Sequence, residues 1–222
     1  MKLLIIGYGK MGRLVDEMAQ ADGVDVVGRI DVENVAADWP AADVAIDFSI
    51  AEAVPANLAR LAASGTNVVI GTTGWQTEEQ ALRGLATASG LGVVASANFS
   101  IGVNLFQMMV AEAARLMAGQ AEYGAWIHEA HHAAKRDAPS GTALLLRDTM
   151  TGAGFSRPID VSATRAGRIP GTHTIGFDAA SDTIELTHTA RDRRGFARGA
   201  LVAAQWLQGR RGWFSMTDVL KG

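Results

Sequence analysis

The stretch EAHHAAKRDAPSGTALLL, residues 129–146, gathers two histidines, a lysine and an aspartate just before a Pro-Ser-Gly-Thr turn and an apolar run. Pro139 disfavours helix at the residue before it and has no N–H to donate, so the chain there is expected to turn or extend. Ser140 then suits the N-cap of a helix over the apolar run. The first helical turn would present the N–H groups of Gly141 and Thr142, with the Thr142 hydroxyl beside them, to an anion. A substrate carboxylate is the expected occupant.

His131 and Lys135 could act on a molecule held there. They share a face if the segment between them is helical, and they could also converge from a loop. A lysine beside an anion site can hold a carboxylate or, where burial and nearby cations lower its pKa, donate a proton. Histidine can do either near neutral pH, and His132, facing another direction, suits a substrate contact. The alternative is a solvated basic loop that ends in a helix cap.

A metal site is the other chemistry that clustered histidines suggest, here from His128, His131 and His132. Few acidic ligands lie close by, and Lys135 would repel a cation, so the sequence predicts no metal. The chain contains no cysteine, which excludes disulfides, thiolate ligands and cysteine nucleophiles.

A second motif, IIGYGKMG, places Gly7, Gly9 and Gly12 in the spacing G-x-G-x-x-G. In a dinucleotide site the first glycine permits a tight turn, the second lets the backbone approach a pyrophosphate, and the third lets helix and strand pack closely. The phosphates would lie at the helix N-terminus. The motif follows an expected strand and opens an expected helix, which strengthens this interpretation. A glycine-rich turn without a dinucleotide is the alternative.

Asp31 ends the next expected strand, 19 residues after Gly12, where an acidic side chain would bind the ribose hydroxyls of the cofactor. A carboxylate repels the 2'-phosphate of NADPH, so Asp31 predicts a preference for NADH. Arg29 and Lys10 could each supply a cation to that phosphate, which leaves use of both cofactors open.

The elements that must position these motifs alternate in the first half of the chain. Residues 2–7, 24–31, 42–49, 66–73 and 92–98 are expected strands, with helical patterns between several of them. This alternation predicts a Rossmann-like, doubly wound parallel sheet of the α/β class. Ligands of such sheets bind at the carboxyl ends of strands, where the loops 71–74 and 96–102 lie. Their small hydroxyl and amide side chains could reach a nicotinamide and its ribose, or could simply cap the loops.

After residue 98 the pattern changes to that of a second, α+β lobe with a mixed sheet. A long helix is expected over residues 102–119, with apolar side chains around much of its circumference. Strands are expected at residues 122–130, 159–167, 173–180 and 182–190, the last two joined as a hairpin. A helix at residues 196–209 and a tail at 213–220 close the chain.

The composition indicates a soluble, cytoplasmic protein without a nucleic-acid or membrane partner. The 222 residues suffice for one large domain or two small ones. No apolar run approaches the roughly 18 residues of a membrane span. The first residues lead into the glycine motif and not into a cleavage site, so no signal peptide is expected. The net charge of -3 gives no reason to expect a nucleic-acid partner.

The string EAHHAAKRDAPSGTA resembles the signature of the 4-hydroxy-tetrahydrodipicolinate reductase family, the dihydrodipicolinate reductases of bacterial and plant lysine biosynthesis. The similarity continues through GYGKMG, AIDFS, GTTG, SANFSIGVN, GFARGALVAAQWL and GWFSMTDVL, and so covers essentially the whole chain. It implies an NAD(P)H-binding lobe of residues 1–99 and 200–222, and a substrate lobe of residues 100–199 whose mixed sheet also builds a homotetramer. The implied reaction is hydride transfer to a cyclic, unsaturated dicarboxylate, giving tetrahydrodipicolinate after loss of water.

The resemblance also implies roles for individual residues. His131 and Lys135 take the catalytic positions, with Lys135 as the proton donor. The substrate would contact His132, Ser140, Gly141 and Thr142. The cofactor, NADH or NADPH, would be held by Gly7, Tyr8, Gly9, Lys10, Met11, Gly12, Asp31, Gly71, Thr72, Thr73, Ala97, Asn98, Phe99, Ser100 and Arg193.

The chain departs from the family pattern in two places. Many members have one more residue in the glycine loop, and this chain is short after the second strand, which leaves the choice between NAD and NADP open. Two other functions stay in view: another two-lobed NAD(P)-dependent dehydrogenase acting on a small amino or keto acid, and a non-catalytic NAD(P)-binding sensor. Substrate-dependent turnover separates the reductase from both.

Overall fold

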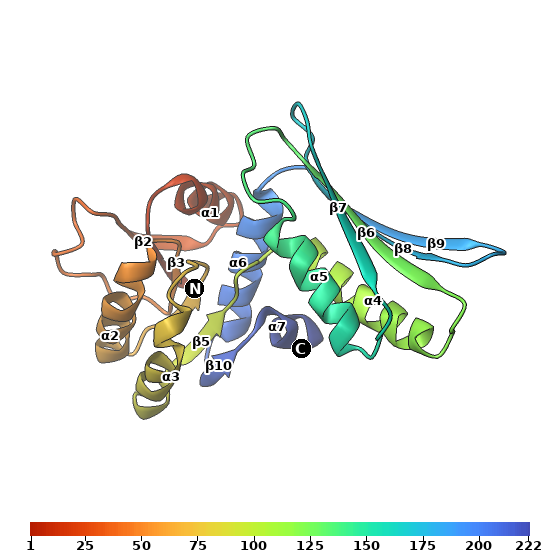
Figure 1. Ribbon diagram of the computed structural model, residues 1–222. Helices are drawn as coiled ribbons and strands as arrows, with labels where there is room; N and C mark the ends of the chain where they lie inside the picture. The colour runs from red at the N-terminus through yellow and green to blue at the C-terminus, as the bar shows by residue number, and fades with distance from the viewer. The chain divides into compact units, whose positions relative to one another are not determined.

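The computed structural model describes residues 1–222, and the chain divides into two compact units (Figure 1). The first unit comprises residues 1–101 and 193–222, and the second comprises residues 102–192. The sequence placed the return to the first unit at residue 200, which falls inside helix α6 (Arg194–Leu207). That helix lies wholly in the first unit because its buried face, including Ala197, Leu201 and Leu207, packs into the core of that unit.

The first unit is built on a six-stranded parallel sheet with the order β10-β5-β4-β3-β1-β2. Its strands are β1 (Lys2–Ile6), β2 (Asp25–Ile30), β3 (Val44–Asp47), β4 (Asn67–Ile70), β5 (Gly92–Ala95) and β10 (Gly212–Phe214). Strands buried on both faces have no polar alternation, and the run Leu3 to Ile6 shows this directly. The five strands predicted from the sequence are confirmed. The short edge strand β10 was not predicted.

Helices cover both faces of this sheet (Figure 1). On one face lie α1 (Lys10–Ala21), α6 and α7 (Met216–Lys221), packed against side chains such as Leu3 and Ile5. On the other lie α2 (Val54–Ser64) and α3 (Glu79–Ala88), each preceded by a 3-10 turn, packed against Leu4 and Ile6. The doubly wound arrangement predicted from the sequence is therefore confirmed, and it brings the carboxyl ends of β1 to β5 to one edge.

The second unit contains a mixed four-stranded sheet with the order β7-β6-β8-β9. Its elements are α4 (Ile101–Ala118), β6 (Gly124–His131), α5 (Gly141–Gly152), β7 (Ile159–Arg165), β8 (Gly171–Asp178) and β9 (Thr183–Ala190). Strands β6 and β7 are parallel, and the other pairs are antiparallel. The predicted hairpin is confirmed as β8 and β9. Both helices lie against the same face of the sheet, where Phe106, Leu146 and Phe177 form an apolar core (Figure 1).

Within the second unit, no helix covers the opposite face of that sheet (Figure 1). Six threonines mark it, and we call it the threonine face: Thr164, Thr172, Thr174, Thr183, Thr187 and Thr189. Cross-strand pairs of hydroxyls join Thr172 to Thr189 at 3.1 Å and Thr174 to Thr187 at 3.0 Å. None of the helices in the chain is both long and apolar enough to cross a membrane.

Candidate cofactor site and active site

The glycine loop between β1 and α1 is tight at two glycines and open at the third. Gly7 has a φ of +83°, and a Cβ there would lie 2.4 Å from the carbonyl oxygen of Phe48. A Cβ on Gly12 would lie 2.1 Å from the carbonyl oxygen of Gly7, so α1 packs against the loop itself. Gly9 has nothing within 4 Å of the position its Cβ would take. The loop therefore leaves open space where a pyrophosphate would approach the backbone.

Three hollows follow the carboxyl edge of the first sheet. The first, lined by Gly7 and Asp31, lies between the ends of β1 and β2. The other two hollows bring most of the remaining predicted cofactor residues together. The second is lined by Gly9, Lys10, Met11, Gly71, Thr72 and Thr73. The third is lined by Met11, Gly71, Ala97, Phe99 and Arg193. Loops after four different strands thus meet along one line, as ligand sites of doubly wound sheets require.

Four predicted cofactor residues turn their side chains into the protein. The Tyr8 hydroxyl donates to Asp16 at 2.5 Å, and the Thr72 hydroxyl donates to Asp47 at 3.1 Å. Phe99 and Ser100 are only 2% and 5% exposed. These side chains shape the loops from within. Asn98 acts similarly, because its side-chain oxygen accepts a hydrogen bond from the Ser100 N–H at 2.9 Å.

Asp47, at the end of β3, is a positioning residue that sequence reasoning missed. It is 1% exposed, and it accepts hydrogen bonds from the Ser49 N–H at 2.8 Å and the Asn57 amide at 2.9 Å, besides that from Thr72. It therefore ties the loop after β3 to the loop after β4. Its signal in the sequence was an acid at the end of an otherwise apolar strand, in AIDFS.

In the second unit, strand register collects the polar groups of the active-site region. Side chains alternate along β6, so Ile127, Glu129 and His131 share the face that α4 and α5 cover. Arg165 lies opposite His131 on β7, and His173 lies opposite Glu129 on β8. This face is apolar in its middle and polar at the end where α5 begins.

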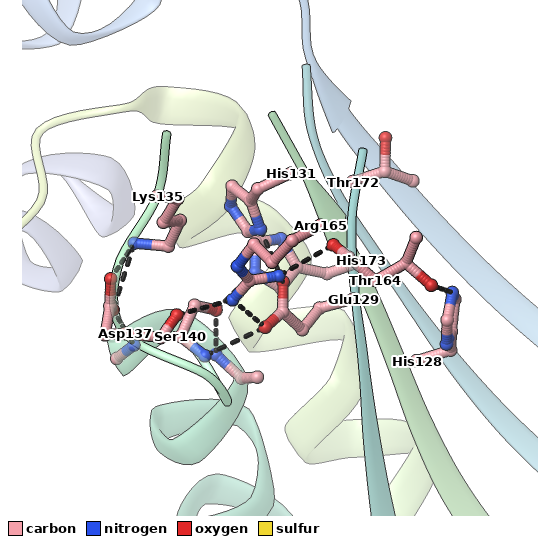
Figure 2. Close-up of polar contacts among 12 residues, drawn as sticks. His128, Glu129, His131, Lys135, Asp137, Ser140, Thr164, Arg165, Thr172 and His173 are labelled. Atoms are coloured by element: carbon pink, nitrogen blue, oxygen red, sulfur yellow. Dashed lines mark hydrogen bonds and ion pairs between the residues drawn. The ribbon is translucent and has the colours of Figure 1, made fainter. Parts of the chain in front are cut away.

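Glu129 is the centre of the polar cluster (Figure 2). It is completely buried, and it accepts hydrogen bonds from Arg165 at 2.6 and 2.8 Å, from the Ser140 N–H at 3.0 Å and from Nδ1 of His131. Burial alone would raise the pKa of Glu129, but the hydrogen bonds from Arg165, His131 and Ser140 outweigh it and hold the pKa below its ordinary value. Because an ionised carboxylate only accepts, His131 donates to Glu129 through Nδ1, which fixes the orientation of the imidazole ring.

Lys135 and the first turn of α5 meet at Asp137. The Lys135 ammonium lies 2.8 Å from one Asp137 oxygen, and the Gly141 N–H donates to the other at 3.3 Å. Arg165 donates to the Asp137 main-chain oxygen at 2.6 Å, which fastens this loop to β7. A carboxylate thus occupies the place where the sequence predicted one, between a lysine and a helix N-terminus, and it belongs to the protein itself.

Ser140 is the N-cap of α5, as predicted from the sequence. Its hydroxyl oxygen accepts from the Ala143 N–H at 3.2 Å and lies 3.1 Å from Nε2 of His173. With a buried side chain and its N–H bound to Glu129, Ser140 anchors the helix. His132, by contrast, is exposed after the end of β6, and Lys135 follows in a turn, not in a helix.

His128 does not join the cluster, because strand alternation sends it to the threonine face (Figure 2). It contacts Ser162 at 2.9 Å and Thr164 at 3.4 Å there. A different trio, Glu129, His131 and His173, places one potential ligand atom each within 4.8 Å of the others. The Arg165 guanidinium already neutralises that carboxylate, so the donor set does not favour a cation.

Glu129, Arg165, His173 and Asp137 are the residues of this region that sequence reasoning did not assign. Glu129 and Asp137 lie within the string EAHHAAKRDAPSGTA, whereas Arg165 and His173 lie on other strands. Only the sheet register brings those two to Glu129.

Fold and site together define a two-unit oxidoreductase, with a Rossmann-like unit and an α+β unit that carries a histidine and lysine cluster. The chain belongs to the dihydrodipicolinate reductase family: the family's N-terminal model matches residues 1–99 and its C-terminal model matches residues 102–220. A 4-hydroxy-tetrahydrodipicolinate reductase of Christiangramia forsetii is 35% identical, covering 99% of this chain and 98% of its own. One of Methanoregula boonei is 37% identical, covering 99% and 97%.

Solved structures share the fold at lower identity. A dipicolinate-bound dihydrodipicolinate reductase from Paenisporosarcina sp. TG-14 has a TM-score of 0.84 at 21% identity, covering 97% of each chain. An amine dehydrogenase from Mycobacterium smegmatis has a TM-score of 0.63 at 12% identity, covering 98% of this chain and 95% of its own. The fold alone therefore does not separate a reductase from a dehydrogenase, and the family assignment rests on the sequence matches.

The Glu129 cluster predicts a specific stability defect. Glu129→Gln leaves the Arg165 charge without its partner, and we expect the free energy of unfolding to fall by about 3 kcal/mol, the low end for a broken buried pair, because the Arg165 side chain is 16% exposed. Urea unfolding followed by circular dichroism measures the change. The exposed Glu122→Gln, just before β6, is the control and should change stability by less than about 0.5 kcal/mol. Equal effects of the two substitutions would contradict the central role of Glu129.

His173 predicts a pH dependence of stability. Burial and, secondarily, the neighbouring His131 lower its pKa to about 4, so the folded protein keeps His173 neutral where the unfolded chain would protonate it. The free energy of unfolding is therefore unaffected by His173 above about pH 6.5. It falls by about 3 kcal/mol in total as the pH drops toward 4, because only the unfolded chain binds the proton readily. Urea unfolding from pH 7 to 4.5 should show this slope in the wild type and in His132→Asn, and a weaker one in His173→Asn. Parallel curves for the wild type and His173→Asn would exclude the effect.

Proposed function

We propose that this protein reduces 4-hydroxy-tetrahydrodipicolinate to tetrahydrodipicolinate, with loss of water, using NADH or NADPH, in the diaminopimelate route to lysine. The observation that supports this most is the intact string from Glu129 to Thr142, folded so that His131, Lys135 and the capped start of α5 project from one polar end of a sheet. The same chain carries a glycine loop with open space at Gly9.

The residues present fit a nicotinamide dinucleotide. The N–H groups at the start of α1 would bind the pyrophosphate, and Gly9 leaves room for it. Asp31 would accept hydrogen bonds from the ribose hydroxyls and would favour NADH. Gly71, Thr73, Ala97 and the other predicted contacts would line the rest of the site. The bound cofactor supplies the hydride.

Lys135 and His131 would supply the protein's share of the chemistry. A substrate carboxylate in the place of the Asp137 carboxylate would meet the same donors, the Lys135 ammonium and the Gly141 N–H, with the Thr142 hydroxyl nearby. Lys135 would donate a proton on the side of the reduced bond away from the hydride. Glu129 would hold the His131 ring in one orientation, so that a protonated His131 can stabilise the dicarboxylate. His132 would complete the contacts at the carboxylate end.

The decisive experiment is NADH and NADPH oxidation by the purified protein, with the cyclic substrate generated in place from pyruvate and aspartate semialdehyde by the preceding synthase. We expect rapid oxidation that depends on the substrate and a lower KM for NADH. Lys135→Ala should reduce kcat by about 10²-fold or more while NADH still binds, because it removes the proton donor. Arg147→Ala removes a positive charge from the exposed side of α5 and serves as the control.

Two outcomes would contradict the proposal. Tight NADH binding without substrate-dependent oxidation would favour the sensor, and oxidation with another small amino or keto acid alone would favour the dehydrogenase. If Lys135→Ala weakens NADH binding and leaves single-turnover chemistry intact, the role assigned to Lys135 is wrong.

We further propose that the protein is a cytoplasmic homotetramer assembled through the threonine face. This face is a polar, helix-free sheet surface with one large aromatic residue, Trp126, whose ring lies against Gly176. By register the face also carries the carboxylates of Asp160, Asp178 and Glu185, which a second copy would have to pair or leave at the rim of the interface. Sedimentation equilibrium should give the mass of four chains, and Thr174→Arg should shift it toward the monomer. A monomeric wild type would contradict this assembly, and cell fractionation tests the compartment.

A further inference from the structure

Asp16 is a buried carboxylate on α1, four residues after Gly12 of the glycine loop. Its side chain is 5% exposed. It accepts two hydrogen bonds from Arg29, on β2, each 2.7 Å long, besides one from Gln20 at 2.9 Å and the one from Tyr8. The hydrogen bonds from Arg29 are the main reason that the pKa of Asp16 is lowered to about 2. The carboxylate is therefore charged at any pH at which the protein would work, and Arg29 is its counter-ion.

Arg29 stands where a cation would matter for the choice of cofactor. It lies on β2, two residues before Asp31, which directly follows the strand; in dinucleotide sites of this type an arginine near that acidic position accommodates the 2'-phosphate of NADPH. The two-pronged contact with Asp16 engages the edge of the guanidinium formed by Nε and Nη2 and pairs its charge, while the Arg29 side chain remains 38% exposed. The end of β2 therefore offers the Asp31 carboxylate to the ribose with the charge of Arg29 already paired.

The other cations of this part of the first unit are Lys10, Arg13 and Arg60. The hollow that Asp31 lines has no lysine or arginine among its lining residues. Lys10 lines a different hollow, the one shared with Gly71 to Thr73. Arg13 donates to the Tyr8 carbonyl oxygen at 3.2 Å, and Arg60 donates to the Val35 carbonyl oxygen at 2.7 Å.

We propose that Asp16 is a specificity-determining residue: by binding Arg29 it keeps the end of β2 selective for NADH. This inference rests on the proposed function, since it concerns the cofactor of that reaction. It also gives the Tyr8 hydroxyl a role, because that hydroxyl joins the glycine loop to the same carboxylate. Asp16 thus holds both the glycine loop and Arg29.

The test is direct binding of NADH and NADPH, measured by fluorescence titration without substrate. Asp16→Asn keeps the shape of the side chain and removes its charge, which frees Arg29. We expect the affinity for NADPH relative to NADH to rise about tenfold, as one charge-assisted hydrogen bond would give. The double variant Asp16→Asn with Arg29→Gln should lose that gain. Glu17→Gln, an exposed substitution with the same change of charge on the same helix, is the control and should leave the ratio unchanged.

Arg29→Gln alone gives a second, independent test that does not depend on the folding of Asp16→Asn. If Arg29 is held by Asp16, the affinities for both cofactors change in parallel, within about twofold. A selective loss of NADPH binding in Arg29→Gln would show that Arg29 already contacts the 2'-phosphate and would overturn the inference. An Asp16→Asn variant that still binds NADH but has an unchanged ratio of NADPH to NADH affinity would also overturn it. A wild type that binds neither cofactor would overturn the proposed function and this inference with it.

Discussion

The arrangement of the second unit depends on one buried charge. A carboxylate with no access to water is costly unless several donors reach it, and Glu129 meets this requirement with three groups: His131 of its own strand, Arg165 of β7 and the N–H of Ser140, the N-cap of α5. Each donor is then fixed relative to the others. The hydrogen bonds to Glu129 fix both the orientation of the His131 ring and the start of α5. Arg165 also binds the main chain of Asp137, and Asp137 in turn binds Lys135.

The sequence predicted those parts of the structure that depend on neighbours along the chain. The turn at Gly7, the close packing of the helix at Gly12, the strand and helix alternation of the first unit and the N-cap at Ser140 are local, and the structure confirms them. The sequence also distinguished the parallel sheet from the mixed sheet. Buried parallel strands are continuous hydrophobic runs, whereas the hairpin of the second unit is marked by two strands joined by a short polar turn.

Contacts across strands could not be predicted in the same way. Arg165 and His173 are far from Glu129 in the sequence, and only the register of β6 with β7 and β8 aligns them. A shift of one residue in either pairing would send them to the threonine face. His128 illustrates the same limit, because it is close to His131 in sequence and on the opposite face in space. For the same reason, Arg29 could be named as a possible phosphate ligand, but its partner Asp16 could not.

The two units solve a similar electrostatic problem in the same way. In each, a buried acid binds an arginine through two hydrogen bonds and so pairs the charge of that arginine: Asp16 with Arg29, and Glu129 with Arg165. Beside these pairs lie Asp31 in the first unit and Lys135, itself paired with the exposed Asp137, in the second. Since a buried bidentate pair is worth more than an exposed one, the Lys135 and Asp137 pair is the one that can exchange partners. In the proposed function, selectivity for an uncharged ribose hydroxyl in one unit, and for a carboxylate in the other, would then depend on which charges the fold has already neutralised.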